Sequence, residues 1–173
     1  SDVCSSDLFI DLFAGIGGMR LAFESAGGCC VYSNEWNKYS QQTYYANFGV
    51  QPDGDITKVQ AESIPDHDIL VAGFPCQPFS LAGKRKGTED DRYLWPAMLD
   101  IIRIVRPRWI VAENVLGIVN WSQGMVFEQV CADLEAEGYE VQSFVIPACG
   151  VGAPHQRYRV WFVAHHAAAY GSN

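Results

Sequence analysis

The sequence predicts an α/β domain with a mostly parallel sheet, helices on both faces and an antiparallel last strand. Short apolar runs alternate along the chain with amphipathic segments of about 10–15 residues, which is the pattern of strands joined by crossover helices. The last two apolar runs are separated by a short loop, and such a connection favours an antiparallel pair. The chain has 173 residues, of which 49% are hydrophobic, and this is enough for one domain with its own core.

The first apolar run, 8–15, is predicted to be a buried strand that leads into a helix over 17–27. We expect Met19, Leu21, Ala22 and Ala26 to lie on or near one face of this helix. Further strands are predicted at 29–35, 54–56, 69–74, 109–115, 141–148 and 159–166, and further helices at 37–48, 94–105 and 125–137. Residues 1–7 and 167–173 are expected to be tails, so that the domain covers 8–166.

Charge and cysteine content narrow the function classes. The formal net charge is −8, from 12 basic and 20 acidic side chains, which by itself argues against a nucleic-acid-binding surface. No apolar run approaches the roughly 20 residues that span a bilayer, and no basic segment typical of a secretion signal opens the chain. The six cysteines are irregularly spaced and form no CxxC pair. We therefore expect a cytoplasmic protein with reduced thiols and no metal site.

A glycine-rich turn, 13–18, follows the first predicted strand. Glycines permit a tight turn and a close approach of the backbone to a ligand, and the helix beyond offers free N–H groups to an anion. Glu35 and Trp36 end the second strand, where they could bind a ribose and stack on a purine. Asp55 ends the next short strand and could accept a purine amino hydrogen. The set points to an adenosine with an anionic or amino-acid tail; the alternative is a tight turn with surface acids.

Cys76 follows the strand at 69–74 and lies between Pro75 and Pro78. The two prolines fix the backbone of this turn in an extended path. A thiol in such a rigid turn is a candidate nucleophile, because the thiolate that forms from a small fraction of it is the attacking species. The alternative, a buried structural thiol, is the interpretation we favour for the other cysteines of the domain.

Polar residues also close the strand at 109–115 and open the last strand. Glu113 could donate a proton to a substrate nitrogen if burial raised its pKa; otherwise it is a solvated carboxylate. Arg157 and Arg159 point the same way along an extended segment. They could bind a substrate carbonyl, a phosphate or a neighbouring acid, and the alternative is a salt bridge at the start of the strand.

In this order, the segments DLFAGIGG, SNEW, GDIT, GFPCQPFS, ENV and QRYR resemble the C5-cytosine DNA methyltransferases. The resemblance extends from Leu8 to about Val163 and is greatest to small bacterial restriction–modification members. The segment around Cys76, together with the downstream Glu113-Asn114-Val115, is its most specific part. The family implies a Rossmann-like methyltransferase fold, S-adenosylmethionine as the methyl donor and double-stranded DNA as the partner.

The resemblance assigns three groups of residues. The cofactor contacts are Phe13, Gly15, Gly17, Glu35, Trp36, Asp55, Ile56, Pro75 and Leu94. The residues that act on a flipped cytosine are Cys76, Glu113, Arg157 and Arg159. The residues of the substrate side and its loop are Gln77, Ser80, Lys84, Arg85, Lys86 and Asn114.

The chain departs from the family pattern in two places. His155 stands where the family's arginine motif usually has Gln. The family's target-recognition region and its last two motifs do not follow the last predicted strand, so we expect a truncated chain or one subunit of a split enzyme, completed by a second chain. Two alternatives are an RNA-modifying member, acting on tRNA, and a fragment without turnover. The expected location is the cytoplasm of a bacterium, with the gene bacterial or phage-borne.

Overall fold

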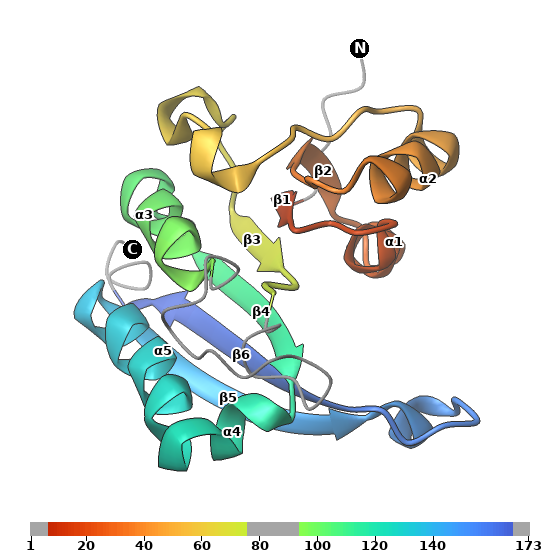
Figure 1. The fold of residues 1–173 in the computed structure, drawn as a ribbon. Helices are drawn as coiled ribbons and strands as arrows, with labels where there is room; N and C mark the ends of the chain where they lie inside the picture. The colour runs from red at the N-terminus through yellow and green to blue at the C-terminus, as the bar shows by residue number, and fades with distance from the viewer. Residues whose placement is uncertain (1–6, 76–93, 168–173) are drawn as a thin grey trace.

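The computed structural model of the chain describes residues 7–75 and 94–167, and it contains one six-stranded sheet (Figure 1). The strands are β1 (Leu8–Leu12), β2 (Cys29–Ser33), β3 (Ile69–Ala72), β4 (Trp109–Val115), β5 (Tyr139–Pro147) and β6 (Tyr158–His166). The helices are α1 (Gly18–Ser25), α2 (Lys38–Phe48), α3 (Trp95–Val105), α4 (Gly117–Asn120) and α5 (Met125–Ala136). Short 3-10 turns include η1 (Ile56–Lys58) and η2 (Ala61–Ser63). None of the helices in these described ranges is long and apolar enough to cross a membrane.

The strand order is β2-β1-β3-β4-β6-β5. β1 runs parallel to β2 and β3, and β3 runs parallel to β4. β6 is antiparallel to both of its neighbours, β4 and β5. The predicted antiparallel last strand is therefore confirmed, because the short β5–β6 connection leaves no length for a crossover helix.

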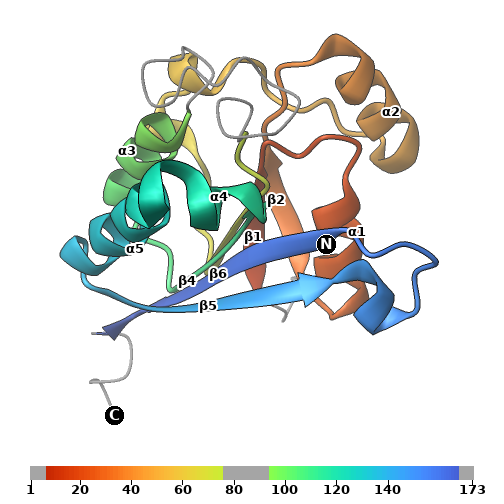
Figure 2. The same ribbon diagram turned by 60° about the horizontal axis from the view of Figure 1, so that its bottom comes forward.

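Helices cover both faces of the sheet, as predicted. After β1 the chain forms β2, which lies next to β1 on one side, and it then crosses back to form β3 and β4 on the other side of β1. Crossover connections between parallel strands are right-handed. The connections that lead toward β2 and those that lead toward β4 therefore place their helices on opposite faces of the sheet. Figure 2 shows α1 and α2 on one side of the strands and α3, α4 and α5 on the other. The reversal between β1 and β3 is the place where sheets of this kind bind ligands.

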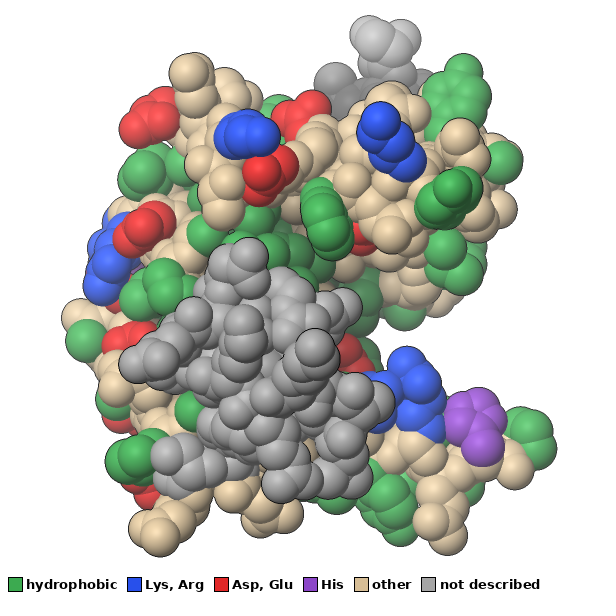
Figure 3. Space-filling view, viewed as in Figure 1, with side chains coloured by type: hydrophobic (Ala, Val, Ile, Leu, Met, Phe, Trp, Pro, Cys, Tyr) green, Lys and Arg blue, Asp and Glu red, His purple; other side chains and the backbone are tan. Residues whose placement is uncertain are grey.

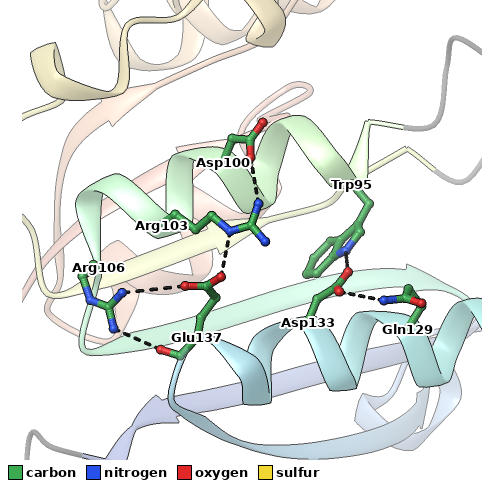
Figure 4. Close-up of polar contacts among 7 residues, drawn as sticks. All are labelled: Trp95, Asp100, Arg103, Arg106, Gln129, Asp133 and Glu137. Atoms are coloured by element: carbon green, nitrogen blue, oxygen red, sulfur yellow. Dashed lines mark hydrogen bonds and ion pairs between the residues drawn. The ribbon is translucent and has the colours of Figure 1, made fainter.

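The main core lies between the sheet and the layer formed by α3 and α5. It contains the buried side chains of Ile10, Leu12, Leu70, Ile110 and Phe162 from the strands and Met98, Ile102, Val130 and Leu134 from the helices. Polar contacts at the two ends of α3 join it to the C-terminal end of α5 (Figure 4). The indole N–H of Trp95 donates to Oδ2 of Asp133 at 2.8 Å, and Arg103 Nε lies 2.7 Å from Oε1 of Glu137. The Trp95 contact fixes the start of α3, where Leu94 is the N-cap residue.

The local structure differs from the pattern of the sequence in two places. The strand expected at 54–56 is reduced to one parallel bridge between Asp53 and Asn34, because the Asp55 carboxylate accepts the N–H of Thr57 and starts η1 instead. The apolar residues expected on one face of α1 do not form its packed side, since Leu21 is 58% exposed and Ala22 and Ala26 are exposed as well.

The side of α1 that packs inward carries Phe23, whose ring centroid lies 5.4 Å from that of Phe9, and Arg20. The side chain of Arg20 is 13% exposed, and its guanidinium lies over the ring of Phe48 at 4.4 Å. The first strand is shorter than expected because Phe13 has a φ of 55° and begins the turn.

Candidate active site

The predicted site residues that the structure describes lie at one edge of the sheet. This edge holds the carboxyl ends of β1 to β4 and the start of antiparallel β6, where Arg159 pairs with Val115. In Figure 3 the edge is hollowed between the part formed by α1 and α2 and the arm formed by β5 and β6. Basic side chains and a histidine lie on the arm side of this hollow; His155, Arg157 and Arg159 belong to that segment.

In the glycine turn after β1, the space beside one glycine is open and the space beside another is filled by a side chain. Gly15 has a φ of +56°, and a Cβ atom there would meet nothing within 4 Å. Gly17 has a φ of +92°, and a Cβ atom there would collide with the ring of Phe48. Both positions need glycine for their backbone conformation. The backbone at Gly15 faces space that a ligand could use, whereas the space beside Gly17 is filled by the protein itself.

Glu35 joins this turn to the start of α2. Its side chain is 7% exposed; Oε2 accepts the N–H of Gly15 at 2.8 Å, and Oε1 accepts the N–H of Asn37 at 2.7 Å. A carboxylate has about four acceptor positions, so two remain for hydroxyl groups such as those of a ribose. Trp36 follows directly and is 71% exposed, which leaves its ring available for stacking.

Asp55 and Ile56 form the next part of the edge. Oδ1 of Asp55 accepts the hydroxyl and the N–H of Thr57, at 2.8 and 3.0 Å, and these hydrogen bonds hold the pKa of Asp55 below its usual value. The carboxyl is therefore ionised and can act only as an acceptor. Ile56 is buried in the core. A cavity of about 490 Å³ opens beside it, toward Ala97 and Ile101 of α3.

Glu113 and Arg159 form an ion pair across β4 and β6, with Nε of Arg159 2.6 Å from Oε1 of Glu113. Burial raises the pKa of the Glu113 carboxyl, and the positive charges of Arg159 and Arg157 oppose that rise. The other oxygen, Oε2, faces Gly73 at the end of β3. Glu113 is thus a half-buried carboxyl with a positioned cation, not a solvated loop residue. The contact of Arg159 with this acid is also a salt bridge at the start of β6, so it fits both the role of binding a neighbouring acid and the alternative of a strand-start salt bridge.

Asn114 points to the opposite face of the sheet from Glu113. It is 2% exposed; its Nδ2 donates to the carbonyl oxygen of Phe74 at 3.2 Å, and its Oδ1 accepts the N–H of Val115 at 2.8 Å. Asn114 therefore holds the backbone directly before Pro75. The remaining predicted residues, Cys76, Gln77, Ser80, Lys84, Arg85 and Lys86, lie outside the described residues.

The sequence reasoning missed Asp11, in the middle of β1. Asp11 is 0% exposed, and neither of its carboxylate oxygens has a hydrogen-bond partner. Burial raises its pKa to about 7, and the charge of Arg20 partly opposes this. A charged residue inside an otherwise apolar strand was the signal that could have marked it, because carboxylates are rarely fully buried.

Comparisons with known proteins identify the family of this chain. Residues 8–170 match the family model of the C-5 cytosine-specific DNA methylases. The chain is 49% identical over 158 residues to the type II methyltransferase M.HhaI of Haemophilus parahaemolyticus, covering 90% of this chain and 48% of that protein. It is 47% identical to the type II methyltransferase M.MspI of Moraxella sp over 166 residues, or 94% of this chain and 40% of that protein.

Among solved structures, a DNMT2 mutant of Spodoptera frugiperda superposes with a TM-score of 0.77 at 26% identity. That match covers 93% of this chain and 50% of the other. The chain thus spans about half the length of these relatives or less. The fold, the strand-end motifs and the match over 8–170 lead to one conclusion: the chain belongs to the C-5 cytosine-specific DNA methylase family.

Proposed function

We propose that this chain is the catalytic part of a DNA (cytosine-5)-methyltransferase that uses S-adenosylmethionine. One observation carries the proposal. The glycine turn, with Glu35 hydrogen-bonded to Gly15, and the Glu113–Arg159 ion pair lie on the same edge of the sheet. A cofactor site and a proton-donating site must be neighbours for methyl transfer onto a base. The relatives named as type II methyltransferases support DNA as the substrate.

The described residues fit an adenosine-containing cofactor. Open space faces Gly15, the carboxylate of Glu35 keeps two acceptor positions, and the ring of Trp36 is exposed for stacking. When bound there, S-adenosylmethionine supplies an electrophilic methyl group. Phe13, Gly17, Asp55, Ile56, Pro75 and Leu94 complete the proposed set of contacts.

Carbon 5 of cytosine is a poor nucleophile until a group adds to carbon 6. In the proposed reaction the Cys76 thiolate forms a bond to carbon 6, while Glu113 protonates ring nitrogen 3. The electron density at carbon 5 then allows it to take the methyl group. A base removes the hydrogen from carbon 5, and the Cys76 thiolate leaves. The cytosine must first leave the duplex, which costs a few kcal/mol.

Burial raises the pKa of the Glu113 carboxyl, and the positive charge of Arg159 lowers it. A base placed over Glu113 would bury the carboxyl further and favour its protonated form. Arg157 and Arg159 would hold the base carbonyl and the nucleophile loop, and Gln77, Ser80 and Asn114 would belong to the substrate side of the site. Lys84, Arg85 and Lys86 would contact phosphates, so replacing them with Ala should weaken DNA binding and flatten its salt dependence.

The test is transfer of labelled methyl groups to DNA by the product of the gene that contains this sequence. With 5-fluorocytosine DNA we expect a covalent adduct that is lost in Cys76→Ser and retained in Cys149→Ser. Cys149 is a suitable control because it is exposed, contrary to the buried position expected for it from the sequence. Glu113→Gln should slow transfer by about 10²–10⁴-fold while S-adenosylmethionine binding stays unchanged.

Other outcomes separate the alternatives. Transfer to tRNA and not to DNA would reassign the substrate to RNA. Cofactor binding without transfer to either would identify a non-catalytic part, and activity that returns on adding a second chain would identify a split enzyme. Methyl transfer that survives Cys76→Ser would refute the mechanism. The bacterial origin of the relatives supports a bacterial cytoplasmic setting.

A further inference from the structure

Helix α2 is linked to the glycine turn at both of its ends, through Glu35 at its start and directly at its end. At its start, Asn37 caps the helix and its N–H donates to Glu35, whose other oxygen accepts the N–H of Gly15. At its end, the last two helical residues, Asn47 and Phe48, reach the same turn, 31 residues away from Asn47 in the sequence. Figures 1 and 2 both show α1 and α2 as neighbours on the same side of the sheet.

Phe48 fills the space that Gly17 leaves open. A Cβ atom on Gly17 would collide with Cε2 and Cζ of this ring. The ring is held in place by Tyr44, whose centroid lies 4.7 Å away, and by Arg20, whose guanidinium lies over it at 4.4 Å. Arg20 also donates to the hydroxyl of Tyr44 at 3.2 Å. The ring therefore has a fixed position against the backbone of the turn.

Asn47 binds the same turn through a hydrogen bond. Its Nδ2 donates to the carbonyl oxygen of Ile16 at 3.2 Å. Asn47 is exposed, and α2 buries one side chain completely, that of Tyr44. The contact of Asn47 thus adds little to the core and acts mainly on the peptide between Ile16 and Gly17.

We propose that Asn47 and Phe48 are positioning residues for the cofactor, which hold the Ile16–Gly17 peptide in the conformation that binds S-adenosylmethionine. The inference rests on the proposed function of the glycine turn. Neither residue needs to touch the cofactor, because both act through the backbone of the turn. A turn that is fixed before binding loses less conformational freedom on binding, and this improves affinity.

The experiment measures S-adenosylmethionine affinity by calorimetry for the gene product and four variants. Asn47→Ala removes the donor, and we expect Kd to rise about fivefold. Asn47→Asp keeps the shape but sets a carboxylate against the Ile16 carbonyl, so its Kd should rise further. Gln42→Ala, at an exposed position of the same helix, is the matched control and should leave Kd unchanged. Phe48→Leu keeps apolar volume but loses the flat contact with Gly17, and its Kd should rise as well.

A positioning role also predicts a specific kinetic pattern. The KM for S-adenosylmethionine should rise in Asn47→Ala, while kcat at saturating cofactor stays within error of the parent. The melting temperature of the protein without cofactor should fall by no more than about 2–4 °C, the effect of losing one hydrogen bond. Equal Kd values for Asn47→Ala, Asn47→Asp and Gln42→Ala would overturn the inference while leaving the proposed function intact. Absence of binding in the unmodified protein would instead overturn the proposed function.

Discussion

Replacing Asn114 with Ala tests the scaffold that holds the chain before Cys76. The change removes two hydrogen bonds, one to the Phe74 carbonyl and one from the Val115 N–H. Each contributes about 1 kcal/mol, and a buried carbonyl left without a donor costs about 1–2 kcal/mol more. We therefore expect Asn114→Ala to lower the free energy of unfolding by about 3 kcal/mol, which for a domain of this size corresponds to roughly 6–12 °C in Tm.

The assay is thermal and urea unfolding followed by circular dichroism. Asn120→Ala is the control, because Asn120 is an exposed residue close by, at the end of α4, and such surface changes stay within about 0.5 kcal/mol. Asn114→Asp adds a second comparison: it keeps the acceptor for Val115 but turns an oxygen toward the Phe74 carbonyl, so it should not restore stability. A Tm loss in Asn114→Ala no larger than that in Asn120→Ala would refute the reasoning.

Three further predictions follow from buried or strained groups. Asp133→Ala leaves the buried indole N–H of Trp95 without its acceptor, so urea unfolding should show a loss of about 1–3 kcal/mol. The pKa of Asp11, raised to about 7, means that the native state binds a proton more tightly than the unfolded chain. Stability should therefore fall as pH rises from about 4 to 7, by up to about 4 kcal/mol, and Asp11→Asn should remove that fall; an unchanged pH profile would contradict it. Gly15→Ala should cost only the backbone strain of about 1–2 kcal/mol, whereas Gly17→Ala should lower Tm by clearly more, because it also meets a packed ring; equal losses would argue against that packing.

The order of strands and helices could be predicted because apolar runs and glycine turns are local signals. The segment at 54–56 could not, since the choice between a strand and a turn depends on the Asp55 side chain. Its carboxylate binds the N–H of Thr57 and so competes with the sheet for that backbone segment. The neighbouring edge accordingly keeps a single bridge, between Asp53 and Asn34.

The packed side of α1 could not be predicted, for a different reason. Periodicity arguments assign inward positions to apolar residues, but here Arg20 takes such a position. Its aliphatic stem is buried, while its charged end stacks on Phe48 and binds Tyr44 and Glu24. These partners come largely from another helix, so a pattern within α1 cannot reveal them. Glu35 and Glu113 could be predicted as site residues because they lie near strand ends. The α2 residues that contact the glycine turn could not, because that contact joins segments that are far apart in the sequence.

Glu113 and Asn114 are neighbours in sequence that face opposite sides of the sheet, and β4 is paired with β6 along all seven of its residues. A single-residue insertion or deletion within β4 would exchange the two sides. The carboxyl would then enter the apolar layer under α3 and α5, and the amide would face Arg159. We therefore expect length changes to be tolerated in the loops around β4 but not inside it. In an evolving or engineered version of this chain, substitutions within β4 should therefore be tolerated better than insertions or deletions there.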